Sequence, residues 1–321
     1  MKRHPLFIML GCLVLVLLLS LSLGQQTINP FQLDPLQLKI VLDLRLPRIV
    51  VALLMGGSLG VAGAILQGVF RNPLADPYVL GTSSGAALAA AFGLLATQGT
   101  GIWLVPLLAL TGALVTSAVV VSLGRDAWGV RAERLLLAGV GIGFFLSAIL
   151  MLVMSLAQAD GVKRALLWMA GDLAGADWSV VPVAGLLMLF GFLLALARRR
   201  GLNALALGDE VAFGLGLEPG RERTLLVLAA SLLTAAAVAL GGIVGFVGLM
   251  VPHAVRALVG ADARRVLPLS AIGGGMLLCL ADTVGRSVVP PVEIPAGVVT
   301  ALIGAPWFLI MLRRATNGGM R

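Results

Sequence analysis

Charged side chains are scarce in this sequence. Asp, Glu, Lys and Arg make up 12% of its 321 residues, whereas 59% of the residues are hydrophobic and the mean hydropathy is +1.04. A typical soluble domain has about 25% charged residues. The composition therefore excludes a soluble globular domain and indicates a membrane protein.

Cysteine and histidine are nearly absent. The two cysteines, Cys12 and Cys279, both fall within long apolar runs, which supports neither a disulfide framework nor a metal site. The two histidines are His4 and His253. We therefore expect this chain to hold no metal ion, no bound cofactor and no catalytic residue.

The phosphate-binding loop of ATPases is missing. That loop contains Gly-Lys-Ser/Thr, and none of the three lysines, Lys2, Lys39 and Lys163, follows a glycine. We expect that this polypeptide does not bind ATP in that way. Acidic residues are missing from the apolar runs too, except for Asp282. Ion-coupled carriers generally need intramembrane carboxylates or equivalent relays, which counts against a secondary transporter, the alternative that we keep.

One short sequence formally matches an enzyme motif. Residues 81–85, Gly-Thr-Ser-Ser-Gly, fit the G-x-S-x-G nucleophile elbow, which needs a strand before the serine and a histidine as base. A proline-containing turn precedes this segment, and both histidines are far away in sequence. The simpler interpretation is a helix start capped by Thr or Ser. We expect that the chain is not an enzyme.

The apolar residues gather in ten runs, each a candidate for a transmembrane helix of about 20 residues. Residues 224–259 contain two of them, because one helix of that length would measure about 54 Å, and Gly241-Gly242 is the predicted turn. The first run follows Lys2 and Arg3 like a signal peptide, but no small-x-small cleavage site follows it, so we expect a retained helix. The runs are 6–24, 49–69, 81–96, 102–123, 134–156, 179–197, 224–241, 245–259, 268–284 and 297–312.

The basic residues predict the orientation. With the N-terminus inside, seventeen of the 23 Lys and Arg residues lie in the inner segments and six in the outer ones. This is a clear positive-inside bias, and it agrees with an even number of spans and with two cytoplasmic termini. The net charge of +8 is then a consequence of topology, and we expect no nucleic-acid partner.

A polar segment, residues 199–223, interrupts the apolar runs. It is too polar to span a bilayer, and its apolar residues recur at roughly helical spacing. The pattern predicts two short helices joined at Gly208, with Asp209 and Glu210 in the first turn of the second, where carboxylates favour the helix N-terminus. A transporter needs such a surface if a soluble partner pushes on it. Since this chain lacks a phosphate-binding loop, we expect that partner to be an ATPase.

A second irregular segment follows the second run. Asn72-Pro73 and Asp76-Pro77 each disfavour helix, so the chain must turn at the inner face. Two interpretations remain open, a capped turn between helices and an inner gate formed by Arg71, Asn72 and Pro73. Gln67, inside the run, is expected to face a pore or to bond between helices. Glycines spaced by four, such as Gly56/Gly60, predict close helix packing.

These motifs together resemble the FecCD-type permeases, the transmembrane subunits of type II ABC importers for iron-siderophore complexes, haem and cobalamin. The resemblance covers essentially the full length. It rests on Arg45-Leu-Pro-Arg48, on residues 67–77, on Leu205-Ala-Leu-Gly-Asp-Glu210 with Leu215-Gly216, on Gly245 to His253 with Arg256, and on Ile294 to Pro306.

The resemblance implies an all-α polytopic membrane protein, a single transmembrane domain over residues 1–321 with about ten helices. Helices two to five and seven to ten are then related by a pseudo-two-fold axis. It also implies a homodimer in the bacterial inner membrane, two cytoplasmic ATPases that bind ATP and Mg²⁺, and a periplasmic binding protein. The residues implied to couple to the ATPase are Leu205, Leu207, Gly208, Asp209, Glu210, Phe213, Leu215 and Gly216.

Arg45, Arg48 and Arg286 lie outside, against the positive-inside bias. They match positions where the family presents arginines to glutamates of the binding protein, so the resemblance implies docking charges. Contacts of Arg45 and Arg48 with lipid headgroups or with Asp43 are the alternative. For the cargo we expect a ferric siderophore, with cobalamin and haem as the alternatives.

Overall fold

The computed structural model describes residues 4–30, 32–96, 103–126 and 129–318. Ten helices coincide with the ten predicted runs, which confirms the all-α organisation. They are α1 (His4–Ser22), α3 (Leu46–Val69), α4 (Thr82–Ala96), α5 (Leu104–Leu123), α6 (Ala132–Ser155), α8 (Val181–Ala197), α11 (Pro219–Gly241), α12 (Val247–Val259), α13 (Ala263–Gly285) and α14 (Ala296–Gly318).

Five helical segments are long and apolar enough to cross a bilayer by themselves: Pro35–Val69, α5, α6, α11 and α13. Helix α8 and the short α9 (Arg199–Leu207) form a sixth candidate that is bent by 58°. Apolar stretches in α1, α4, α12 and α14 are shorter, between 10 and 17 residues. Within a bundle such short helices suffice where neighbouring protein covers their ends.

The remaining elements are short. They are α2 (Pro35–Ile40), the π-helix η1 (Val41–Arg45), the 3-10 helix η2 (Pro77–Leu80), α7 (Ala159–Met169), α10 (Asp209–Gly214), and the paired strands β1 (Arg125–Asp126) and β2 (Gly129–Val130). The second span thus begins at Pro35, fourteen residues before the predicted start of the second run at residue 49, because Asp34 and Gln37 form a capping box there.

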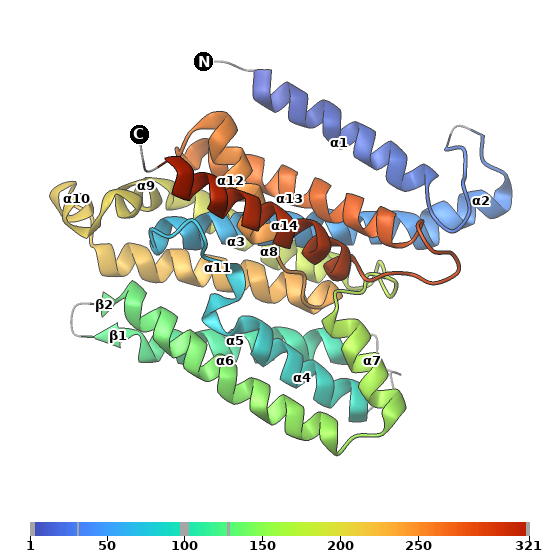
Figure 1. Ribbon diagram of the computed structural model, residues 1–321, viewed down its shortest axis with the longest axis horizontal. Coiled ribbons are helices and arrows are strands. Elements are labelled where there is room, and N and C mark those ends of the chain that lie inside the picture. The colour runs from blue at the N-terminus through green and yellow to red at the C-terminus, as the bar shows by residue number, and fades with distance from the viewer. Residues whose placement is uncertain (1–3, 31, 97–102, 127–128, 319–321) are drawn as a thin grey trace.

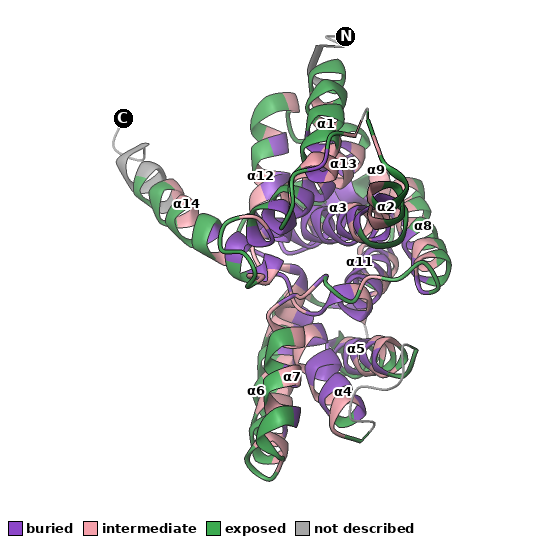
Figure 2. Ribbon diagram, turned by 90° about the vertical axis from the view of Figure 1, so that its right-hand side faces the viewer, coloured by how far each residue is buried: buried purple, intermediate pink, exposed green. Residues whose placement is uncertain are grey.

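The helices lie roughly along one axis of the molecule (Figure 1). Helix α1 begins and α14 ends at the end of the bundle that carries α9 and α10, which we call the α9 end; the opposite end, at α2, is the α2 end. Figure 2 shows α4 to α7 as a group on one side of α11 and α14 projecting from the body. Chain ends on one side agree with an even number of spans.

The packing pattern repeats within the chain. Helix α3 packs against α11, α12 and α13, and α11 packs against α3, α4 and α5. Likewise α4 packs against α5 and α6, as α12 packs against α13 and α14. This is the pattern that the predicted pseudo-two-fold relation between helices two to five and seven to ten requires.

The core forms where α3 meets α13 and α12 at close range. A Cβ added to Gly56 would lie 2.2 Å from the carbonyl oxygen of Gly274, and one added to Gly60 would lie 2.3 Å from that of Ser270. These glycines let two backbones touch, which confirms the packing interpretation for Gly56/Gly60. Gly245, which follows Gly241 at the same spacing of four, has open space where a Cβ would stand.

Candidate functional site: the α9 end and the charged cluster at the α2 end

The polar segment folds as predicted, into α9 and α10 with Gly208 between them. Gly208 has φ 130° and ψ 159°, a conformation that glycine adopts readily and that other residues avoid. Asp209 and Glu210 stand in the first turn of α10. Gly216, with φ 76°, turns the chain away after α10 toward α11.

The apolar residues of this segment divide into two groups. Leu207, Phe213 and Leu215 are 72%, 75% and 66% exposed, so they present a hydrophobic surface at the α9 end. Leu205, one of the residues implied to couple to the ATPase, is 1% exposed. It packs within the chain and supports α9, because on this helix the side facing the bundle carries Leu202 and Leu205.

One arginine holds the segment in place through an ion pair and a hydrogen bond. Arg223 of α11 donates to Asp209 Oδ1 at 2.7 Å and to the carbonyl oxygen of Val130 in β2 at 2.7 Å. Glu210 is exposed beside it. The short hairpin of β1 and β2 therefore braces α10 through a single guanidinium group.

The Arg71-Asn72-Pro73 turn lies beside this segment. Arg71 has φ 51°, a left-handed conformation that is uncommon outside glycine, and Asn72 Oδ1 accepts a hydrogen bond from the Leu74 amide at 2.9 Å. All three residues are exposed. A Cβ on Gly208 would lie 3.5 Å from Arg71 Nη1, so the predicted gate and the predicted coupling segment are neighbours. The geometry is that of a capped turn, and the gate stays a prediction.

Gln67 bonds between helices, one of the two alternatives that the sequence left open. Its Nε2 donates to the carbonyl oxygens of Gly248 and Leu249 at 3.2 Å each, and its Oε1 accepts from Arg256. Arg256 also donates to the carbonyl oxygen of Ala64. A side chain that is 4% exposed thus ties α3 to α12.

The three arginines at the α2 end belong to an internal cluster. Arg45 and Arg286 are 6% and 5% exposed. Arg45 donates to the carbonyl oxygens of Leu21 and Gln26, and Arg286 donates to that of Ser20. The expectation of three free outward charges thus needs correction: in this chain two of the guanidinium groups are covered, because backbone carbonyls at the end of α1 bind them.

Arg48 is held by two carboxylates. It meets Asp282 at 2.8 Å through a bidentate contact and Glu293 at 2.7 Å through Nη1. Asp282 is also 3.5 Å from Arg286. The sequence suggested Asp43 as a partner for Arg48. In the structure Asp282 and Glu293 take this role, although they are 234 and 245 positions away from Arg48 in the sequence. Glu293 also accepts from Gln25 at 3.0 Å.

This cluster borders a pocket of about 420 Å³ at the α2 end. Gln25, Arg45, Arg48, Arg286 and Glu293 are among its lining residues. Asp282, the one acidic residue of the predicted runs, is buried between two guanidinium groups and so is committed to structure. Sequence reasoning missed Glu293 as a partner of Arg48, because the only feature that distinguishes Glu293 in the sequence is its position among apolar residues.

The G-x-S-x-G match has no nucleophile elbow. Residues 77–80 form the 3-10 helix η2 where the elbow needs a strand. Among the residues that the structure describes, no three His, Cys, Asp or Glu side chains lie close enough to hold a metal ion. The Tyr78 hydroxyl in η2 donates to the carbonyl oxygen of Val244 and accepts from the Val244 amide. These bonds connect the irregular segment before α4 with the one before α12.

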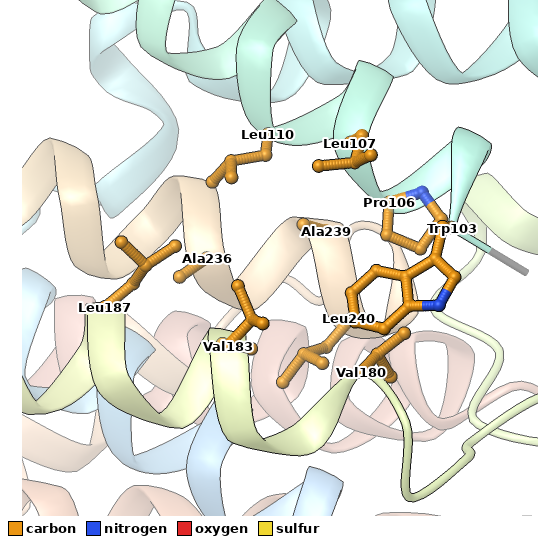
Figure 3. A pocket seen from close by; sticks show the side chains of 11 residues that line it. Trp103, Pro106, Leu107, Leu110, Val180, Val183, Leu187, Ala236, Ala239 and Leu240 are labelled. Atoms are coloured by element: carbon orange, nitrogen blue, oxygen red, sulfur yellow. The ribbon is translucent and has the colours of Figure 1, made fainter.

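A second hollow lies between α5 and α8 over α11 (Figure 3). Apart from Trp103, hydrocarbon side chains line it, so it offers no partner for the polar groups of a hydrophilic cargo. The side chains are Trp103, Pro106, Leu107, Leu110, Val180, Val183, Ala184, Leu187, Ala236, Ala239 and Leu240.

Comparisons with known proteins agree with this architecture. Residues 12–314 match the FecCD transport family. The chain is 40% identical to the hemin transport system permease protein HmuU of Yersinia pestis, over 96% of each chain. It is 39% identical to the Fe(3+)-citrate import system permease protein YfmE of Bacillus subtilis, over 97% of this chain and 96% of the relative.

A solved structure has the same fold throughout. It is an inward-facing conformation of a transporter assigned to the metal-chelate ABC type, and it superposes with a TM-score of 0.90 at 30% identity, covering 98% of this chain and 100% of that one. The family match and the shared fold both extend over nearly the whole chain. The chain therefore belongs to the FecCD transport family and has the fold of an ABC importer permease.

Proposed function

We propose that this chain is the membrane-spanning subunit of an ABC importer that moves an iron complex, with a ferric siderophore as the preferred cargo. Two similar permeases are named for hemin and for Fe(3+)-citrate, which supports an iron complex. Cobalamin is the other cargo represented among the relatives. ATP hydrolysis is assigned to separate subunits, since this chain has no Gly-Lys dipeptide.

The observation that carries this proposal is the surface of the α9 end. Leu207, Phe213 and Leu215 stand exposed in the polar segment that forms the short helices α9 and α10. Apolar side chains on a segment outside the bilayer need a protein partner to remove them from water. We assign this surface to the groove of a cytoplasmic ATPase, with Glu210 and Asp209 at its polar rim.

The proposed assembly has two copies of the chain, two ATPases and one periplasmic binding protein in a bacterial inner membrane. The positive-inside bias supports a cytoplasmic α9 end. Helix α14 projects from the body (Figure 2), and only 11% of the apolar stretch of α6 is buried. These uncovered helices support a second copy of the chain, with lipid covering the remaining faces.

Phe213→Ala tests the coupling surface. An aromatic anchor in a desolvated groove often contributes a few kcal/mol, so we expect ATPase subunits to dissociate more readily and ATP-driven uptake to fall. Phe190→Ala is the matched control, since Phe190 is 63% exposed on α8, within a span. Full uptake and full ATPase retention with Phe213→Ala would refute the assignment.

The cargo is tested separately. The complete transporter in proteoliposomes is given its binding protein with a ferric siderophore, hemin or cobalamin, and accumulation inside is measured. We expect accumulation of the ferric siderophore. Accumulation of cobalamin alone would refute an iron cargo and leave the ABC importer assignment intact.

A further inference from the structure

Asn203 links the α9 end to a helix that reaches the α2 end. Its Nδ2 donates to Asp262 Oδ1 at 2.9 Å, and its Oδ1 accepts from the backbone amide of Ala263 at 2.8 Å. Asp262 is the N-cap of α13 and also accepts from the Arg264 amide at 3.0 Å. One side chain of α9 therefore uses both ends of its amide on the first turn of α13.

These bonds differ in kind from the contact of α9 with α3. Leu202 packs against α3 at Gly68, where an added Cβ would lie 2.6 Å from Leu202 Cδ1. An apolar contact tolerates sliding, whereas two hydrogen bonds in fixed directions set the position of one helix relative to the other. The Asn203 amide and the Arg264 backbone amide also hold the pKa of Asp262 below its ordinary value, so the carboxylate stays charged as an acceptor.

Helix α13 continues from this contact to the charged cluster. It runs from Ala263 to Gly285, and Asp282 near its far end binds Arg48 of α3. Between the two ends, α3 and α13 meet backbone to backbone at Gly56 and Gly274. Close-packed backbones do not slide without first separating. Displacement of α13 at the α9 end must therefore move α3 and the Arg48 cluster as well.

We propose that Asn203 is a positioning residue for energy coupling: its two bonds pass movement of α9, driven by the ATPase, to α13 and through α3 to the charged cluster at the α2 end. The inference rests on the proposed function, since it needs an ATPase on α9. Its role is separate from docking, which belongs to the exposed Leu207, Phe213 and Leu215.

An exchange of the two side chains tests the proposal. Asn203→Asp sets a second carboxylate against Asp262 and removes the donor. In the double variant Asn203→Asp/Asp262→Asn the amide and the carboxylate change places. The carboxylate at position 203 then accepts from the Ala263 amide and from the side-chain amide at position 262. The oxygen of that side-chain amide accepts from the Arg264 amide. Asp262→Asn alone keeps an oxygen for both donors, so it controls for the loss of charge.

The measurement is uptake per ATP hydrolysed by the complete transporter in proteoliposomes with its binding protein. Changes along a coupling path alter coupling by about 2-fold to 30-fold, and we expect Asn203→Asp to lower the ratio within that range. The exchanged pair should return it to within about twofold of the unaltered protein, and Asp262→Asn should stay there. ATPase subunits retained per permease are measured in the same samples.

Three results would overturn the inference: an unchanged ratio in Asn203→Asp, no recovery in the exchanged pair, or a loss that appears as fewer retained ATPase subunits instead of lower coupling. Failure of the proposed function is a different result, because then the unaltered protein itself would bind no ATPase or show no ATP-driven uptake.

Discussion

Glu293 binds Nη1 of Arg48, the part of the guanidinium group that a docking protein would need to contact. Asp282 occupies one edge of the guanidinium group, and Glu293 takes Nη1 at 2.7 Å. The side chain of Asp282 is 3% exposed, whereas that of Glu293 is 28% exposed and borders the pocket at the α2 end. A carboxylate of a periplasmic binding protein could reach Arg48 only by replacing Glu293. We therefore predict that Glu293→Gln strengthens docking.

The two carboxylates should differ in what their removal costs. A partly exposed ion pair contributes about 0–1 kcal/mol, so Glu293→Gln should lower the Kd of the binding protein by up to about fivefold and leave the fold intact. Removing Asp282 leaves Arg48 and Arg286 without their shared buried carboxylate. Breaking a buried pair costs about 3–5 kcal/mol, so Asp282→Ala should reduce stability independently of docking.

The assay is association of the binding protein with the transporter in nanodiscs at several salt concentrations. The association rate should rise in Glu293→Gln and fall with salt, since rim charges act mainly on encounter. Glu218→Gln, the same change at the α9 end, should leave the rate unaltered. Slower association in Glu293→Gln would show that Glu293 itself contacts the binding protein, and the reasoning would be wrong.

Three further predictions concern the bundle. Gly63→Ala should lower the free energy of unfolding by about 1–3 kcal/mol, because its Cβ would stand 1.8 Å from the Gly248 carbonyl oxygen. Gly141→Ala is the control and should not lower the melting temperature, because the space around Gly141 is open. Equal melting temperatures of the two variants would contradict the packing. Gln67→Leu should cost a similar amount, about 1–3 kcal/mol, since Gly248, Leu249 and Arg256 lose their partner; an unchanged melting temperature would refute this. Asn72→Cys in both copies should form a disulfide across the dimer in the nucleotide-free transporter, as a gate at the two-fold axis requires, and absence of the cross-link in every state would leave only the capped turn.

Much of the fold followed from local sequence signals. Ten apolar runs became ten helices, and Gly208 with Asp209 and Glu210 marked the start of α10 correctly. Each signal acts over one or two helical turns, where hydrophobic spacing and glycine freedom decide the backbone. The helical lead-in from Pro35 and the amphipathic α7 were missed because neither resembles a span.

The charged cluster could not be predicted from such signals. Arg48 was identified as special, but its partners Asp282 and Glu293 are 234 and 245 residues away, and only the packing of α13 on α3 brings them together. The same holds for Asn203 and Asp262, which are 59 residues apart. The exposure of individual side chains could not be predicted either. Leu205 and Leu207 are two residues apart on one helix, yet Leu205 is buried and Leu207 is 72% exposed.

The distribution of close contacts indicates where the transporter can change shape. Gly56, Gly60 and Gly63 bring α3 against the backbones of α13 and α12 at distances that leave no room for a Cβ. Separating such backbones forfeits dispersion contacts along the whole seam. Helices α6 and α14 make such backbone contacts at Gly139 with Val79 and at Gly297 with Ala170. Elsewhere along these two helices apolar side chains stay uncovered, and Phe144 and Leu302 are 75% and 70% exposed. Alternation between two states requires elements whose contacts can be exchanged at low cost. We therefore expect α3, α12 and α13 to move as one unit between the charged cluster and the α9 end, while α6 and α14 change partners.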